Sequence, residues 1–301
     1  MNEASVYTKR FGIFISIVLA SMILITLSIL LKTTIEKPYE KREYKNLAAV
    51  EITAGSVYIY DATRGEVIME RNATTPRPIA SITKVMSSIV AYDIWPKDEI
   101  IEVSLPNFVP NEAGGSLVML TEKWQLQNLL KLLLTKSSNE AADALVNHAA
   151  MKNIDFIALM NKKAKEMGLW QTRFSNASGL DLSLSEPGAT SSAEDVAFML
   201  DYAVDRYPEL FETTVTKGYN AKSEAGTDYY VENTNKVADF LPGLIASKTG
   251  LTDLAGGNLA FALRMKDQSI VIVVVLGSTK EGRFADAEKI TQALNMDLKE
   301  E

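Results

Sequence analysis

The residues best suited to chemistry in this 301-residue chain are Ser81 and Lys84, which form its single Ser-x-x-Lys pattern. The stretch from Ala80 to Tyr92 reads as a helix, in which residues three positions apart share a face. A serine hydroxyl beside a lysine amine is the arrangement that a serine nucleophile with a lysine base requires. About one such pair is expected by chance in a chain of this size, and an N-cap serine with a solvated lysine is the simpler interpretation. Other residues must therefore decide whether this pair is catalytic or structural.

Two further patterns would complete such a site. A free lysine has a pKa of about 10.4 and is a poor base, so burial or a second cation must lower that pKa. Lys248 offers such a cation in the single Lys-Thr-Gly run, within a predicted strand. Ser137 and Asn139 form the single Ser-x-Asn, at a predicted helix start. The structural alternatives are helix capping for Ser137 and a solubilising edge-strand position for Lys248.

The three patterns occur in the order Ser-x-x-Lys, Ser-x-Asn and Lys-Thr-Gly, which is the motif set of penicillin-binding proteins and β-lactamases. On these residues the chain resembles the low-molecular-mass penicillin-binding D-alanyl-D-alanine carboxypeptidases of peptidase family S11, from about residue 49 to residue 297. The resemblance includes these segments: Arg77–Lys84, Gly114–Ser116, Ser137–Ala142, Asn176–Asp181, Ser191–Asp195 and Lys248–Asp253.

The resemblance implies a serine-type carboxypeptidase that removes the terminal D-Ala from peptidoglycan stem peptides and is acylated by β-lactam antibiotics. It implies that Ser81 attacks the carbonyl of the penultimate D-Ala, that Lys84 accepts its proton, and that Ser137 relays a proton to the leaving amine. It further implies an oxyanion hole made by the backbone N–H groups of Ser81 and Leu251. The implied substrate-binding residues are Asn139 for the amide, Lys248 for the local potential, Thr249 and Arg283 for the terminal carboxylate, and Gly250 and Leu251.

Two residues depart from the family pattern. Ser138 stands where Gly or Ala is frequent, and Leu251 where many relatives carry His or an aromatic residue, so substrate preference is open.

Three rival functions share some or all of these motifs. A β-lactamase of the class with this motif set uses a Glu-x-x-Leu-Asn element, which the chain lacks. A D,D-endopeptidase of the same family is not separated from a carboxypeptidase by sequence. A catalytically silent wall-binding protein is disfavoured because the motifs are intact.

Composition excludes several other classes of function. The net charge of −7 gives no general attraction to nucleic acid, so no nucleic-acid partner is expected. There is no cysteine, and therefore no disulfide, thiolate nucleophile or Cys-ligated zinc. His148 is the only histidine and reads as a packed or surface residue of a helix, which excludes a His-rich metal site. We expect neither a metal nor a cofactor.

The N-terminal segment predicts a membrane anchor. Residues 11–31 carry no charge over 21 positions, and at about 1.5 Å per residue a helix of that length crosses the roughly 30 Å of a bilayer core. The flanking Lys and Arg residues favour a cytoplasmic C-terminal domain. The wall chemistry implied above favours the opposite, and we adopt it. The prediction is a cytoplasmic tail (1–10), an uncleaved single-pass anchor (11–31), a charged, solvated linker (32–48) and an extracytoplasmic catalytic domain (49–301).

The rest of the chain predicts an α/β (α+β) fold. Strand patterns at 56–60, 66–70, 257–265 and 269–277 lie towards its two ends, and helical patterns at 126–134, 139–150 and 155–167 lie between them. A closing helix is expected at 284–296, and loops at 176–190 and 217–228. This order predicts an antiparallel sheet assembled from both ends, with helices packed on it and a helical insert. The resemblance implies that it is the β-lactamase/transpeptidase-like fold.

Overall fold

The computed structural model describes residues 19–27, 43–109 and 116–297, in two units that divide after Glu43. In the first unit residues 19–27 are helical and exposed. Within the described residues, no helix combines the length and the apolar character that crossing a bilayer requires. The predicted tail at 1–10, the rest of the predicted 11–31 anchor and residues 32–42 of the linker lie outside the described residues.

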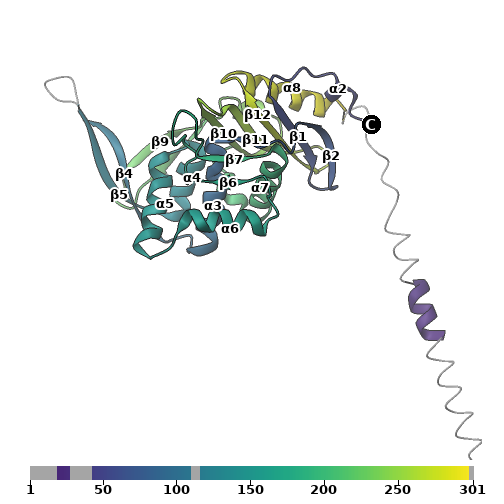
Figure 1. Cartoon of the computed structure of the whole chain (residues 1–301), viewed down its shortest axis with the longest axis horizontal. Coiled ribbons are helices and arrows are strands. Elements are labelled where there is room, and N and C mark those ends of the chain that lie inside the picture. The colour runs from purple at the N-terminus through teal and green to yellow at the C-terminus, as the bar shows by residue number, and fades with distance from the viewer. Residues whose placement is uncertain (1–18, 28–42, 110–115, 298–301) are drawn as a thin grey trace, which may run out of the picture. The chain divides into compact units, whose positions relative to one another are not determined.

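The second unit is built on a five-stranded antiparallel sheet in the order β10-β11-β12-β1-β2 (Figure 1). Its strands come from the two ends of the unit, as predicted: β1 (Ser56–Asp61), β2 (Glu66–Arg71), β10 (Leu244–Thr252), β11 (Gly256–Arg264) and β12 (Ile270–Ser278). The first and last parts meet where β1 pairs with β12, with Val57 opposite Val275. Because β10 lies at one edge of this sheet, one side of its backbone is left for other partners.

Two apolar layers cover the central sheet. Alternate residues along a strand point to opposite faces, so Val57 and Val273 pack under the closing helix α8 (Gly282–Asp297), whereas Tyr58 and Val274 join the helical core. Burial on both faces explains why the Ile-Val-Ile-Val-Val-Val-Leu run of β12 is apolar at every position. α8 covers residues 282–297, and the predicted closing helix is confirmed.

The helical part lies against the other face of the sheet. Its helices are α3 (Thr83–Ile94), α4 (Leu126–Thr135), α5 (Asn139–Met151), α6 (Phe156–Glu166) and α7 (Ala193–Arg206). The three helices predicted from periodicity are confirmed as α4, α5 and α6. Asp155 caps the start of α6 by accepting from the Ala158 N–H, and Gly168, with φ of +74°, follows its end. Local sequence therefore determines where α6 begins and ends.

Several smaller elements complete the unit. The short strands are β3 (Arg77–Pro78), β6 (Arg173–Phe174) and β7 (Ala189–Ser191), and the 3-10 turns are η1 (Ala80–Ile82), η2 (Pro208–Phe211) and η3 (Ala238–Phe240). Two further antiparallel pairs are formed by the ten-residue strands β4 (Ile100–Val109) and β5 (Ser116–Gln125), and by β8 (Gly218–Lys222) and β9 (Asp228–Glu232). The loop predicted at 217–228 is wrong, because 218–222 form β8. There Tyr219 and Ala221 face the core while polar residues alternate with them. Residues 114–115 of the matched Gly-Gly-Ser lie outside the described residues.

The charged linker predicted to end at residue 48 is wrong for its last five residues. The short helix α2 (Lys45–Ala48) packs on α8, and Leu47 is only 1% exposed. The Asp297 carboxylate accepts the backbone N–H groups of Asn46, at 2.8 Å, and Leu47, at 3.0 Å. One apolar side chain and one carboxylate thus dock a segment whose composition is otherwise typical of a solvated linker. The folded unit begins at Tyr44.

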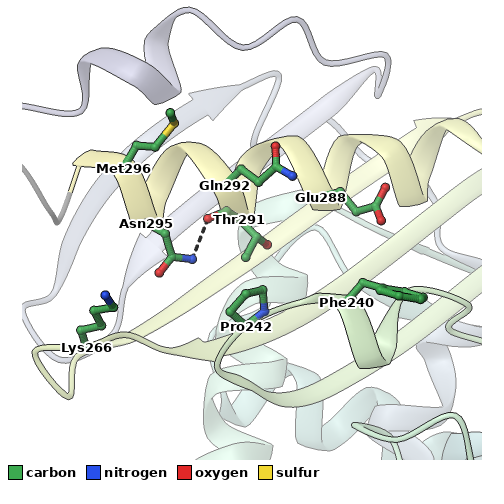
Figure 2. Close-up of a pocket in the computed structure, with 8 residues that line it drawn as sticks. All are labelled: Phe240, Pro242, Lys266, Glu288, Thr291, Gln292, Asn295 and Met296. Carbon is green, nitrogen blue, oxygen red and sulfur yellow. Dashed lines mark hydrogen bonds between the residues drawn. The ribbon is translucent and has the colours of Figure 1, made fainter.

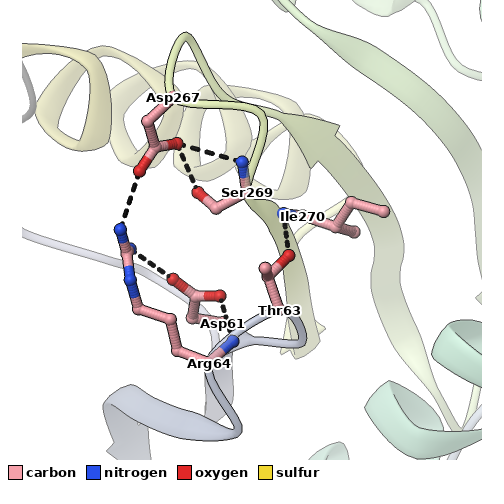
Figure 3. A network of polar contacts seen from close by, with 6 residues as sticks. All are labelled: Asp61, Thr63, Arg64, Asp267, Ser269 and Ile270. Atoms are coloured by element: carbon pink, nitrogen blue, oxygen red, sulfur yellow. Dashed lines mark hydrogen bonds and ion pairs between the residues drawn. The ribbon is translucent and has the colours of Figure 1, made fainter. Parts of the chain in front are cut away.

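A polar network ties the turn of the β1–β2 hairpin to the turn between β11 and β12 (Figure 3). The Arg64 guanidinium bonds Asp61 at 2.7 Å and Asp267 at 2.8 Å. Thr63 accepts the backbone N–H of Ile270 at 2.8 Å. These contacts fix the end of the sheet where the first and last strands meet.

Candidate active site

Ser81 and Lys84 lie at the junction of η1 and α3. The sequence predicted that Ser81 lies in the first turn of an α-helix. In the structure Ser81 instead belongs to the 3-10 turn η1, and α3 begins two residues later, at Thr83. The predicted pairing is present, because Lys84 Nζ lies 3.0 Å from Ser81 Oγ. The lysine side chain is fully buried, whereas the serine is half-buried. The hydroxyl is therefore open to a ligand while the amine beneath it is not.

The Lys84 amine has three hydrogen-bond partners. Besides Ser81, it donates to Asn139 Oδ1 at 2.9 Å and to the Ser178 carbonyl at 2.7 Å. An ammonium group has three protons, and these three acceptors satisfy all of them. When the amine is neutral it keeps two donors, for Asn139 and Ser178, and its lone pair faces the Ser81 hydroxyl. The geometry thus allows Lys84 to accept the serine proton.

The surroundings of Lys84 bring its pKa into the neutral range. Burial lowers the pKa to about 7, against the opposing effect of the nearby Asp143 and Glu140 carboxylates. A lysine with that pKa is roughly half neutral at pH 7 and can act as a base. The sequence indicated that the pKa of Lys84 must be lowered for it to act as a base. In the structure, burial within the folded unit lowers it.

The Lys248–Gly250 run lies on the edge strand β10, as predicted, next to the turn that carries Ser81. Lys248 is buried and donates to the Thr249 carbonyl at 3.0 Å. Burial, then Lys84 and Arg283, lower the pKa of Lys248. A Cβ added at Gly250 would lie 2.6 Å from the Ile79 carbonyl, so only glycine lets the strand pass this close to η1. The third motif is therefore adjacent to the first.

The segment Asn176–Asp181 closes the site, a role that sequence reasoning did not give it. Its Ser178 carbonyl accepts from Lys84, and Gly179 has φ of +78°. A Cβ at Gly179 would lie 2.0 Å from the carbonyl of Ala80, which itself has φ of +48°. The Asn-Ala-Ser-Gly-Leu-Asp match was the available signal, but nothing local shows that it contacts a lysine 94 positions away.

The remaining predicted residues differ in their placement. Ser137, with φ of +62°, is half-buried and precedes the N-cap of α5, and no hydrogen bond within the described chain joins it to Ser81 or Lys84. Thr249 Oγ1 lies 2.7 Å from Thr234 Oγ1, and Leu251 is 41% exposed. Arg283 is 6% exposed, and its Nη1 donates to the Gly250 carbonyl at 2.5 Å. The roles expected of these side chains stay predictions.

Two other features lie apart from this cluster. His148 bonds Glu99 at 2.9 Å and lies edge-on to Trp95, which confirms its interpretation as a packed helix residue. A hollow of about 580 Å³ between α8 and the loop before β10 is lined by Phe240 and Met296 among others and by none of the predicted site residues (Figure 2). Neither contributes a reacting group to the Ser81 site.

Comparison with known proteins agrees with this geometry. The sequence model of the D-alanyl-D-alanine carboxypeptidase family, peptidase S11, matches residues 42–280. The chain is 28% identical over 268 residues to D-alanyl-D-alanine carboxypeptidase DacF of Bacillus subtilis (strain 168), covering 88% of this chain and 68% of the relative. It is 31% identical over 243 residues to a D-alanyl-D-alanine endopeptidase of Escherichia coli (strain K12), covering 80% and 76%. The fold is similar to the cefotaxime-bound penicillin-binding protein D2 of Listeria monocytogenes, with a TM-score of 0.66, 28% identity and coverage of 81% and 98%.

Proposed function

Because the chain belongs to the D-alanyl-D-alanine carboxypeptidase family of serine peptidases, we propose that it removes the terminal D-Ala from peptidoglycan stem peptides through an acyl-enzyme on Ser81. The observation that carries the proposal is the buried Lys84 amine, which lies 3.0 Å from the half-buried Ser81 hydroxyl and has a pKa lowered to about 7. A helix-capping serine with a solvated lysine would have neither the burial nor the contact.

In the proposed reaction neutral Lys84 takes the proton of Ser81 while Oγ attacks the carbonyl carbon of the penultimate D-Ala. The oxyanion is stabilised by the backbone N–H groups of Ser81 and Leu251. Lys84 then gives up this proton by way of the Ser137 hydroxyl to the nitrogen of the departing D-Ala as the C–N bond breaks, which leaves an ester on Ser81 and a neutral Lys84. Water next attacks the ester and its proton goes to Lys84, which passes it to Ser81 Oγ as the ester bond breaks, so that free peptide leaves and the hydroxyl is restored.

We assign binding of the terminal carboxylate to the part of the site beside Lys248 and Arg283, which are its positively charged residues on and behind β10. Thr249 would donate its hydroxyl to the carboxylate, and Asn139 would donate its amide N–H group to the peptide, because its Oδ1 is taken by Lys84. Arg283 would act as a positive charge behind β10, since its Nη1 already donates to the Gly250 carbonyl. Lys248 lies buried beside it and would contribute to the same positive potential.

Covalent labelling with a fluorescent penicillin tests the nucleophile, and the solved relatives with bound cefotaxime and ampicillin support the choice of probe. We expect an adduct on the peptide that contains Ser81, and no adduct in Ser81→Ala. Ser185→Ala, which changes an exposed serine of the 176–190 loop, is the matched control and should label normally. An adduct that persists on another serine in Ser81→Ala would overturn the assignment.

A D,D-endopeptidase is the second candidate, favoured by the 31% identity to the endopeptidase relative. It would use the same residues and differ only in the group that leaves. Purified protein given both a pentapeptide and a cross-linked dimer separates the two. Faster release of D-Ala than of monomer supports the carboxypeptidase, and the opposite order supports the endopeptidase.

We further propose that the folded unit lies outside the cytoplasmic membrane, anchored through residues 11–31. The support is the uncharged 21-residue run and the location of the proposed substrate. Protease added to intact spheroplasts should degrade the folded unit, with a cytoplasmic protein as the protected control. Complete protection of the unit would contradict this topology.

A further inference from the structure

The segment Asn176–Asp181 joins two walls of the proposed active site. On one side, its Ser178 carbonyl accepts from Lys84 of α3 at 2.7 Å. On the other side, Asp181 contacts the end of β10 and the turn that leads from it to β11. The segment thus connects the helix of the proposed base with the strand that carries the third motif.

Both oxygens of the Asp181 carboxylate accept hydrogen bonds from this turn. Oδ1 accepts the Thr252 hydroxyl at 3.0 Å, and Oδ2 accepts the Leu254 backbone N–H at 3.2 Å. The Thr252 hydroxyl oxygen in turn accepts the Ala255 N–H at 3.2 Å, which closes the turn. Hydrogen bonds to a carboxylate are stronger than those between neutral groups. One side chain therefore holds both a side chain and the backbone of the turn.

The rest of the segment is held against α3 and η1. Ser87 of α3 donates to the Ala177 carbonyl at 2.7 Å. Asn176 Oδ1 accepts the Gly179 N–H at 2.7 Å, and Gly179 packs against the backbone of η1. None of these contacts involves Asp181. The segment is therefore a fixed support from which Asp181 holds the turn in place.

We propose that Asp181 is a positioning residue for acylation, which holds the end of β10 so that the Leu251 N–H group lies where the oxyanion forms. Because β10 is an edge strand, the sheet holds this end on the β11 side alone. Asp181 bonds neither Ser81 nor Lys84 within the described chain, so its contribution is geometric. Preorganised donors lose much of their effect when they are displaced. The inference rests on the proposed carboxypeptidase function, because the oxyanion belongs to that reaction.

The rate of covalent labelling by a fluorescent penicillin, measured at several concentrations, tests the proposal because it separates binding from acylation. We expect Asp181→Ala to lower the limiting acylation rate constant by about ten- to a hundredfold, with little change in the penicillin concentration that gives half of that rate. Asp181→Asn keeps an oxygen for the Thr252 hydroxyl, so its rate should fall less. Asp155→Ala is the matched control, because it removes an exposed carboxylate that also accepts a backbone N–H, at the start of α6. It should label at the wild-type rate.

Two readouts separate positioning from a loss of stability or of charge. Labelling well below the melting temperature of each variant keeps the protein folded, so destabilisation alone leaves the acylation rate unchanged. Asp181 is not among the charges that shift the pKa of Lys84. The pH profile of Asp181→Ala should therefore reach a lower plateau with the same midpoint as that of the wild type.

A double-mutant cycle with Thr252→Val tests the contact itself. Because this variant has already lost the hydroxyl that Asp181 accepts, adding Asp181→Ala should slow acylation less than it does in the wild type. The inference is overturned by a wild-type rate in Asp181→Ala, by an equal fall in Asp181→Asn or Asp155→Ala, by a shifted midpoint, or by falls that simply multiply in the cycle. Failure of the proposed function looks different: the wild type itself would form no adduct on Ser81.

Discussion

The pH dependence of acylation follows from the burial of Lys84. An ordinary lysine, with its pKa of 10.5, is about 0.03% neutral at pH 7, whereas one with a pKa of about 7 is roughly half neutral. Burial therefore raises the fraction of the base form about a thousandfold. Since only the neutral amine can accept the Ser81 proton, the acylation rate should rise about tenfold per pH unit below about 7 and level off above it.

The Asp143→Asn substitution tests directly the direction in which a nearby carboxylate shifts the pKa of Lys84. The Asp143 carboxylate is the largest influence that opposes burial and raises the pKa of Lys84. Its removal should lower that pKa and move the rising limb of the profile to lower pH. Glu166→Gln is the control, because Glu166 pairs with Lys162 on the surface of α6 and is not among the charges that raise the pKa of Lys84. Its profile should coincide with that of the wild type.

The assay is the second-order rate constant for covalent labelling by a fluorescent penicillin, measured from about pH 5 to pH 10 with constant ionic strength. Acylation by penicillin isolates the first step, because its rate does not depend on hydrolysis of the ester. A rising limb near pH 10, as for an unperturbed lysine, would refute the reasoning. A shift of the Asp143→Asn profile to higher pH would refute it as well.

Three further outcomes are expected. Gly179→Ala should abolish labelling and lower the melting temperature, because its Cβ would meet the Ala80 carbonyl at 2.0 Å with φ of +78°; normal labelling would contradict the contact. Asp297→Ala should lower the free energy of unfolding by about 1–3 kcal/mol, through loss of the two α2 N–H contacts, and leave labelling intact; urea unfolding measures the first and gel fluorescence the second. The penicillin adduct should survive for minutes by intact-protein mass spectrometry, because the chain lacks Glu-x-x-Leu-Asn; loss within seconds without peptide turnover would favour a β-lactamase.

Some features of the fold and site could be predicted from local sequence. Helical periodicity gave α4, α5 and α6, alternation gave the β1–β2 hairpin, and the apolar run gave β12, because each pattern reflects a repeat within one element. The three motifs identified Ser81, Lys84, Asn139 and Lys248 as a set, because each motif is a short pattern with fixed spacing that can be read within one element.

Tertiary structure decided the rest, since it depends on contacts between distant residues. The docking of α2 needs Asp297, which lies 251 positions from Asn46. The β8–β9 hairpin is stabilised by a core that Tyr219 and Ala221 enter from a polar-looking segment. The properties of Lys84 depend on its burial and on the Ser178 carbonyl, neither of which is encoded near Lys84. Sequence identified Ser81 and Lys84 as the proposed nucleophile and base, but only burial in the folded chain brings the pKa of an ordinary lysine into the range that the proposed reaction requires.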